Sequence, residues 1–214
     1  MTWGRNHDTC QSSGQNFFRW RSSGRTGIKA GSFLSFIRRE LCRHRSFRQW
    51  KVDVLHCLAG ILRPTEGTVF VDDLCLSEMK EKEAAVWRAS YVGYVFQKPL
   101  LLPFLTVMEN ILLSAELAGR KDSRTEAERF LSAVGLDQYG SKNPVHLSMG
   151  EQQRVSFVRA VIREPRLLLA DEPTSSLDRE QQCRFLMKLM LQYQKQSGCM
   201  LICATHDPAV QASF

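Results

Sequence analysis

The sequence predicts an α/β fold built around a parallel sheet. Two apolar runs, "RLLLADEP" and "CMLICATHD", are continuous rather than alternating and end in polar residues, which is typical of buried parallel strands. From about Val54 onward, strand patterns alternate with helical ones, as they do in sheets whose helices cover both faces. In such sheets the functional residues gather at the carboxyl ends of the strands, so we expect the site there.

Local patterns predict the remaining elements. Strands are expected at "GTVFVDD" and "YVGYVFQ", which are rich in β-branched and aromatic residues. Helices are expected over residues 107–118, 124–134 and 150–163. Asp178 is expected to cap a further helix that reaches about Gln196. The buried side of that helix is expected to carry Phe185, Leu186, Leu189 and Met190.

The composition indicates one sizeable domain from a reducing compartment. The 214 residues are 43% hydrophobic, enough for a single core with a small subdomain. No apolar run is long enough to span a membrane, and no apolar stretch near the N-terminus resembles a secretory signal. The 7 cysteines form no CxxC pair, which argues against a zinc site and favours free thiols in the cytosol.

The positive charge is concentrated at the N-terminus. Residues 1–54 carry 11 Lys/Arg and 3 Asp/Glu, whereas residues 55–214 carry 18 and 19. We therefore expect an anomalous, poorly ordered basic segment over 1–54 and an α/β domain over 55–214. The basic segment would suit nucleic acid or another acidic surface, or would have no selected structure. Its arginines and aromatics have no regular spacing, which favours the second interpretation, and no nucleic acid is expected as a partner.

Two adjacent carboxylates, Asp171 and Glu172, end the first buried strand. Such a pair is costly to bury unless a cation or a substrate uses it. In P-loop nucleoside triphosphatases the first acid helps to hold Mg²⁺, and the next one orients or deprotonates the attacking water. We therefore predict that Asp171 is the metal-side acid and Glu172 the catalytic base. The alternative is that the pair caps the helix that follows.

Three further motifs carry polar residues suited to phosphate or metal. In "HLSMGEQQR", Ser148 and Gly150 begin a helix whose free N–H groups can hold phosphate oxygens, with Gln152 in its first turn. Gln97 ends the strand "YVGYVFQ" and can reach a metal ion or water. His206 ends the last strand and can bond a γ-phosphate. Taken singly, each is better explained as an ordinary cap, surface or sheet-edge residue.

Together these motifs resemble the ATPase domain of ABC transporters over residues 54–210. Gln97 matches the Q-loop, "LSMGEQQR" the signature, "RLLLADE" the Walker B strand, "SSLD" (ending at Asp178) the D-loop, and His206 the switch histidine. The wording "FQKPLLLPFLTVMENI" and "LADEPTSSLD" is most similar to the lipoprotein-release and macrolide-export branch. Met149 departs from the pattern, which usually has glycine there.

The resemblance implies a P-loop NTPase-like sheet, with a small helical subdomain at about residues 100–160, that binds ATP and Mg²⁺. The catalytic residues would be Glu172, His206 and Gln97, and the metal-side residues Asp171 and Gln97. A second ATPase subunit would pair head to tail with the first, and ATP held by that copy would be contacted by Ser148, Gly150 and Gln152. An integral membrane permease would be the other partner and would hold the protein at the cytoplasmic face of the cell membrane.

The phosphate loop of this family, GxxxxGK[ST], is missing. Lys51 occupies the lysine position, but Trp50 replaces the glycine before it, and Val52 and Asp53 replace the two hydroxyl residues. An indole obstructs the close approach of backbone to phosphate, and a carboxylate repels phosphate. We therefore expect weak ATP binding through Lys51 and poor hydrolysis. Codons compatible with "RQWKVDV" read GSGKST one nucleotide later, so a frameshift that ends near Leu55 is one explanation.

Two other function classes stay open. Some DNA-repair and chromosome ATPases share an LSxGE signature but insert a long coiled coil after the Q-loop, whereas Gln97 and Ser148 are only 51 positions apart. A non-catalytic protein that binds nucleic acid through its basic N-terminus would lose salt-dependent binding without residues 1–50. The chain is also expected to be short at its C-terminus, where the family usually adds a strand and a helix after His206.

Overall fold

Two sheets organise the part of the chain that the structure describes. The computed structural model describes residues 18–21, 50–64, 67–72, 74–177, 180–207 and 210, with backbone alone for 18–21 and for Trp50. The antiparallel sheet has the order β1 (Phe18–Arg21), β2 (Thr68–Val71), β3 (Leu74–Cys75). The parallel sheet has the order β4 (Val92–Val95), β5 (Leu167–Asp171), β6 (Met200–Ala204). The predicted parallel sheet is confirmed, and the strands expected at "GTVFVDD" and "YVGYVFQ" are β2 and β4.

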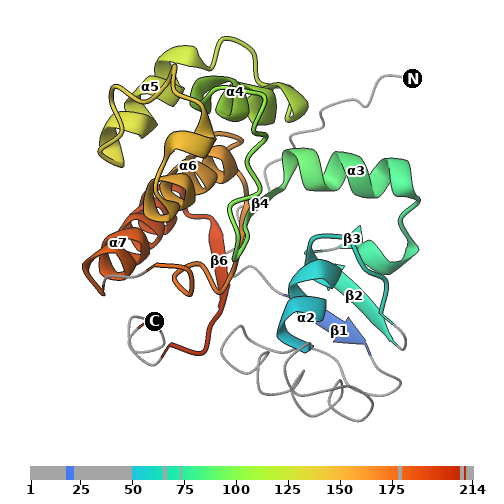
Figure 1. The fold of residues 1–214 in the computed structure, drawn as a ribbon. Coiled ribbons are helices and arrows are strands. Elements are labelled where there is room, and N and C mark those ends of the chain that lie inside the picture. Colours follow the sequence, from blue (N-terminus) through green and yellow to red (C-terminus); the bar gives the residue numbers. More distant parts are fainter. Residues whose placement is uncertain are drawn as a thin grey trace.

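Helices flank the parallel sheet on both sides (Figure 1). The described helices are α2 (Trp50–Leu58), α3 (Glu81–Ser90), α4 (Val107–Leu117), α5 (Arg124–Ala133), α6 (Met149–Val161) and α7 (Glu180–Ser197), with short 3-10 turns η1 (Leu76–Glu78) and η2 (Pro144–His146). The last four helices were predicted to within a few residues of their ends. Helix α3 was not predicted from the sequence; its described residues bury only Ala84 and Trp87.

Alternate residues of the central strand β5 divide the core into two clusters. Leu168 and Ala170 pack with residues of α4, α5, α6 and α7. Leu167 and Leu169 pack with α2, β2 and Trp87 of α3. Successive side chains of a strand point to opposite faces, so one continuous apolar run serves both clusters. The central strand is therefore covered on both faces, and its polar residues can only emerge at its end.

A buried asparagine shapes the loop that follows β4. Asn110 of α4 accepts a hydrogen bond from the backbone N–H of Leu102 at 2.8 Å. Its Nδ2 donates to the carbonyls of Leu102 at 3.1 Å and Leu105 at 3.2 Å. The loop thus closes on the first turns of α4, where Thr106 and Glu109 form a complete capping box. This arrangement fixes the path of the chain just beyond Gln97.

The expected burial of α7 was partly wrong. Leu186 and Met190 are buried, but Phe185 is 40% exposed because it lies one position off the stripe that faces the core. The predicted cap, Asp178, lies outside the described residues, as does most of residues 1–54. The division at residue 54 therefore stays a prediction, although α2 begins at Trp50 and runs across it. Within the described ranges, no helix has the length and apolar character needed to cross a bilayer.

Candidate functional site

The candidate site lies where the parallel strands end. Asp171 is the last residue of β5 and pairs in register with Ala204, the last residue of β6. Glu172 follows Asp171, and His206 follows Ala204 by two positions. Gln97 comes two residues after the end of β4, the other neighbour of β5. The sheet thus brings polar residues that are far apart in sequence to one edge, as the sequence predicted.

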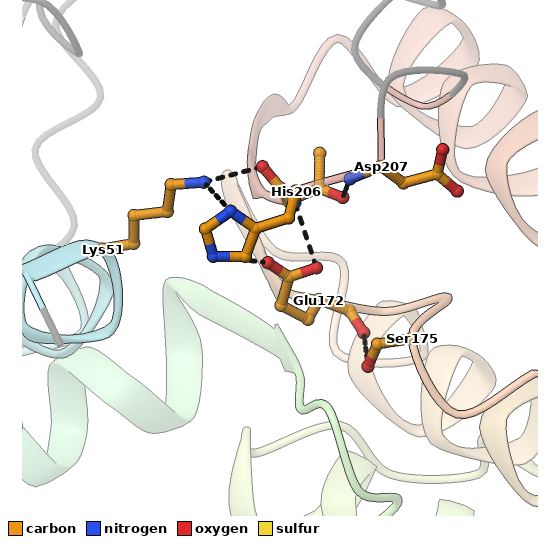
Figure 2. Close-up of polar contacts among 6 residues, drawn as sticks. Lys51, Glu172, Ser175, His206 and Asp207 are labelled. Carbon is orange, nitrogen blue, oxygen red and sulfur yellow. Dashed lines mark hydrogen bonds and ion pairs between the residues drawn. The ribbon is translucent and has the colours of Figure 1, made fainter. Parts of the chain in front are cut away.

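Glu172 and His206 face each other across this edge (Figure 2). The backbone N–H of His206 donates to Glu172 Oε2 at 3.2 Å, and His206 Nε2 lies 3.5 Å from Glu172 Oε1. Glu172 is 17% exposed at its side chain, and its Oε1 makes no hydrogen bond within the described residues. Glu172 Oε1 is buried beside His206, so this carboxylate could act as a base only towards a water molecule that takes the place of the histidine.

The backbone of Glu172 is held in an unusual conformation. Its φ is +42°, in the left-handed region that non-glycine residues seldom adopt. Its N–H donates to Ala204 O at 2.8 Å, and its carbonyl accepts from the N–H of Ser175 at 3.1 Å and from Ser175 Oγ at 2.9 Å. These bonds offset the conformational strain and aim the carboxylate across the edge towards His206 rather than along the strand.

Lys51 extends from the start of α2 to the same edge (Figure 2). Its Nζ donates to Thr205 O at 2.7 Å and lies 3.3 Å from His206 Nδ1. An ammonium group has only donors, so Nδ1 is the acceptor, and Nε2 carries the proton that faces Glu172. Lys51, His206 and Glu172 therefore form a continuous row of donor and acceptor groups.

Asp171 is the most buried acid of the site, at 9% exposure. Burial, and then the neighbouring Glu172, raise the pKa of Asp171, while the charges of His56 and Lys51 act in the opposite direction. Two adjacent carboxylates at this depth repel each other, and a bound cation would relieve that repulsion. Among the described residues, no group of three or more His, Cys, Asp and Glu could hold a metal ion by itself. A metal here would need ligands from a substrate or from water.

The signature residues form a separate group at the start of α6. Ser148 caps the helix: its Oγ accepts from the N–H of Glu151 at 3.3 Å, and its own N–H donates to Glu151 Oε2 at 2.7 Å. Burial acts to raise the pKa of Glu151, but hydrogen bonds from Ser148 and Tyr139, together with the charge of Arg154, outweigh it and lower that pKa. Gly150 packs closely on α7, since a Cβ atom there would lie 2.7 Å from Gln182 Oε1. Gln152 Nε2 donates to the carbonyl of Leu147 at 2.9 Å.

The two groups are not bonded to each other. Within the described ranges, no hydrogen bond or ion pair joins Ser148, Gly150 or Gln152 to the row of Lys51, His206 and Glu172. The side chain of Gln97 is exposed, and its carbonyl accepts from Ser176 Oγ at 3.3 Å. The side chain of Trp50 lies outside the described residues, so its predicted clash with phosphate stays a prediction. The same holds for the suggested nucleic-acid contacts of residues 1–54.

Two residues that link the site were missed by the sequence analysis. Gln153 is fully buried and donates to the carbonyls of Phe96 and Pro173. Thr205 supplies the carbonyl that receives Lys51. The signal for Gln153 was its position: it precedes Phe157 by four residues on the apolar side of α6, where a polar side chain must find partners. No comparable signal exists for a backbone carbonyl.

Comparison with known sequences supports the resemblance to ABC transporter ATPase domains along most of the chain. A family model described as ABC transporter matches residues 51–175. The lipoprotein-releasing system ATP-binding protein LolD of Idiomarina loihiensis is 36% identical over 159 residues, which are 73% of this chain and 69% of that protein. The ABC transporter ATP-binding protein YtrE of Bacillus subtilis is 36% identical over 162 residues, 75% of this chain and 70% of that protein.

Solved structures with the same fold include an ATP-binding cassette dimer in a post-hydrolysis state, bound to ADP and Pi. It aligns with a TM-score of 0.70 and 30% identity over 76% of this chain and 72% of that one. Another is cbiO1 of Clostridium perfringens, which is part of the ABC transporter complex cbiONQ. It aligns with a TM-score of 0.64 and 28% identity, over 76% of this chain and 65% of the cbiO1 chain.

Proposed function

The chain belongs to the ABC transporter family of ATP-binding domains, and from that premise we propose that it is the ATPase subunit of an exporter of the lipoprotein-release type. The observation that carries the proposal is the row of Lys51, His206 and Glu172 at the ends of β5 and β6. This row supplies a cation, a proton donor and a buried base. These are groups that phosphoryl transfer to water uses.

The described residues fit Mg²⁺ and ATP in their chemistry. Asp171 and Gln97 supply oxygen atoms, which Mg²⁺ prefers, and Lys51 supplies charge for phosphate oxygens. Bound Mg²⁺ would neutralise charge that develops on the phosphates. Glu172 would orient and deprotonate the attacking water, and His206 would donate from Nε2 to a γ-phosphate oxygen in place of Glu172. Asp171 is buried beside Glu172, so a bound cation would relieve the repulsion between the two carboxylates.

We also propose that this chain binds ATP only weakly. The start of α2 offers Lys51 but no glycine loop, and Asp53 adds a negative charge to the first turn. Backbone N–H groups normally supply most phosphate contacts in such a loop. The chain would therefore keep the groups for hydrolysis while lacking those for affinity.

A second copy would complete the site. Within the described residues, no hydrogen bond or ion pair joins Ser148, Gly150 or Gln152 to Glu172, so the signature is available for a nucleotide held by another copy. The free N–H groups at the start of α6 suit phosphate oxygens once a nucleotide arrives from another molecule. This arrangement supports a head-to-tail pair in which each copy contributes its signature to the ATP of the other.

An exposed apolar patch supports a membrane permease as the further partner. Leu100, Phe104 and Val145 are 57%, 76% and 60% exposed. The loop that carries the first two is tied to η2, because Asn143 Nδ2 donates to Pro103 O at 2.6 Å. Exposed apolar side chains held in a fixed loop favour a protein contact. Docking on a permease here would keep the chain at the inner face of the cell membrane.

The test compares ATP binding by the native chain and by a loop-restored chain in which residues 48–53 are replaced by GSGKST. We expect restoration to tighten ATP binding by roughly 100-fold or more, since at least two charge-assisted hydrogen bonds are gained, and to produce Mg²⁺-dependent phosphate release. Calorimetry and a phosphate-release assay measure both. A restored chain that folds, yet neither binds nor hydrolyses ATP, would refute the proposed function.

A further inference from the structure

Gln153 is a buried amide that joins three segments of the site. It lies on α6 and is 0% exposed. Its Nε2 donates to Phe96 O at 2.8 Å and to Pro173 O at 3.1 Å. Phe96 directly precedes Gln97, and Pro173 directly follows Glu172. Both amide protons are therefore used, each on a loop that leaves a different strand of the parallel sheet.

We propose that Gln153 is a positioning residue that sets Gln97 and Glu172 relative to each other and to the signature helix α6. It contacts neither nucleotide nor water in this role and acts only through the two carbonyls. The positioning role rests on the proposed function, whereas the tether itself exists without nucleotide. The two can therefore be tested separately.

In the loop after β5, Gln153 holds the residue that follows Glu172. Glu172 has a left-handed backbone that is held on one side by Ala204 and on the other by Ser175. Pro173 has no N–H to donate, so its carbonyl is the only backbone polar group through which that residue can be fixed. Gln153 binds that carbonyl and so prevents the strained turn from relaxing.

The loop after β4 is held at two successive carbonyls. Gln153 binds Phe96 O, and Ser176 Oγ binds Gln97 O at 3.3 Å. Ser176 itself belongs to the loop after β5, so it links the two loops but brings in no helix. Of Gln153 and Ser176, only Gln153 connects the two loops to α6. A shift of the signature helix would therefore reach both loops through one side chain.

The remaining atom of the amide supports a role for this residue beyond stability. Gln153 Oε1 is buried without a hydrogen-bond partner in the described part of the chain. A half-satisfied buried amide stabilises a fold less than a fully paired one, and it compares poorly with an apolar side chain of equal volume. What the amide supplies instead is the directed pair of bonds to the two loops.

The tether is tested by hydrogen exchange in the native chain and in Gln153→Met, which keeps the volume and removes both donors. We expect amides in residues 97–98 and 174–177 to exchange roughly fivefold to tenfold faster, as the loss of one hydrogen bond of order 1 kcal/mol predicts. Amides of α4 and α5 should not change. Gln192→Met makes the same chemical change at an exposed position of α7 and should leave both loops unchanged.

Uniform acceleration throughout the core, or unchanged loops, would overturn the tether. If Gln153→Met does not fold, the side-chain amide protons of Gln153 in the native chain decide the matter by NMR. We expect them to exchange far more slowly than those of Gln192. Equal rates would overturn the tether as well.

The positioning role is tested by kinetics in the loop-restored chain. Gln153→Met should lower kcat by roughly 10-fold, the scale of a disturbed catalytic geometry, while KM stays unchanged because neither carbonyl binds nucleotide. Loosened loops with a normal kcat would overturn the positioning role and leave the proposed function standing. A restored parent chain without turnover would overturn the proposed function, and the tether would still be judged by exchange.

Discussion

Two helix starts in this molecule contrast sharply. Helix α6 begins with a complete capping box between Ser148 and Glu151 and with a glycine in its first turn. Helix α2 begins at Trp50 and carries Lys51 and Asp53 in the same region. The N-terminus of a helix favours anions, so both starts could serve phosphate. One of them has the small and polar residues for that purpose, and the other lacks them.

The contrast indicates that the proposed catalytic edge is positioned without the glycine-rich phosphate loop. Asp171, Glu172 and His206 are placed by the pairing of β5 with β6, which is buried on both faces. Lys51 still reaches Thr205 and His206 from the altered start of α2. The proposed loss of ATP affinity at the start of α2 is therefore compatible with an intact arrangement of Asp171, Glu172 and His206.

The largest effect is expected at the edge itself. In the loop-restored chain, Glu172→Gln removes the base, so turnover should fall by roughly 10² to 10⁴-fold while ATP binding is retained. Phosphate release and calorimetry measure the two quantities. Glu128→Gln, on the exposed side of α5, is the matched control and should change neither. Unchanged hydrolysis in Glu172→Gln would exclude the assignment of the base.

The next largest effect concerns the altered helix start. In the native chain, Lys51→Met should weaken the remaining ATP affinity by roughly 10-fold or more, because a hydrogen bond to a charged group is removed. Titration with a fluorescent ATP analogue at low salt measures this affinity. Lys188→Met changes an exposed lysine of α7 in the same way and should have no effect. Equal affinities of Lys51→Met and the native chain would mean that α2 contributes nothing to binding.

A smaller effect separates capping from nucleotide binding at α6. Ser148→Ala and Thr106→Ala both remove the N-cap of a capping box, so each should lower the free energy of unfolding by about 1 kcal/mol. Only Ser148→Ala should also weaken the ATP-dependent pairing of loop-restored chains. Urea denaturation and sedimentation measure the two effects. If both variants pair normally, Ser148 is a cap and nothing more.

The smallest effect is a pH dependence of stability. Burial beside Glu172 raises the pKa of Asp171, so folding without a cation is less favourable once this acid is ionised. The destabilisation is absent below the ordinary aspartate value of 3.8 and grows as pH rises through the folded pKa. Asp171→Asn should therefore raise the Tm at neutral pH, and the gain should shrink as the pH is lowered towards 3.8. A gain that is independent of pH would contradict this origin.

The parts of the fold that could be predicted are those with a clear pattern of apolar residues in the sequence. The buried strands β5 and β6 are continuous apolar runs, so their ends, and with them Asp171, Glu172 and His206, could be located in advance. Helix α3 could not, because its two buried residues leave too weak an apolar stripe. The hydrogen bonds of Gln153 and Lys51 could not be predicted either, because both side chains donate to backbone carbonyls of loops distant in sequence. Such contacts depend on how loops pack and not on the residue type of the acceptor.

The left-handed backbone of Glu172 has a consequence for how this protein can change. Glycine adopts that conformation freely, whereas a residue with a side chain is strained there by of order 1 kcal/mol or more. Glu172→Gly would therefore relieve strain at the position that we propose for the catalytic base. Selection for robustness alone would tend to erase the base. If Glu172 is the proposed base, stability and activity make opposite demands at this position, and a chain that does not need to hydrolyse ATP would gain stability from glycine there.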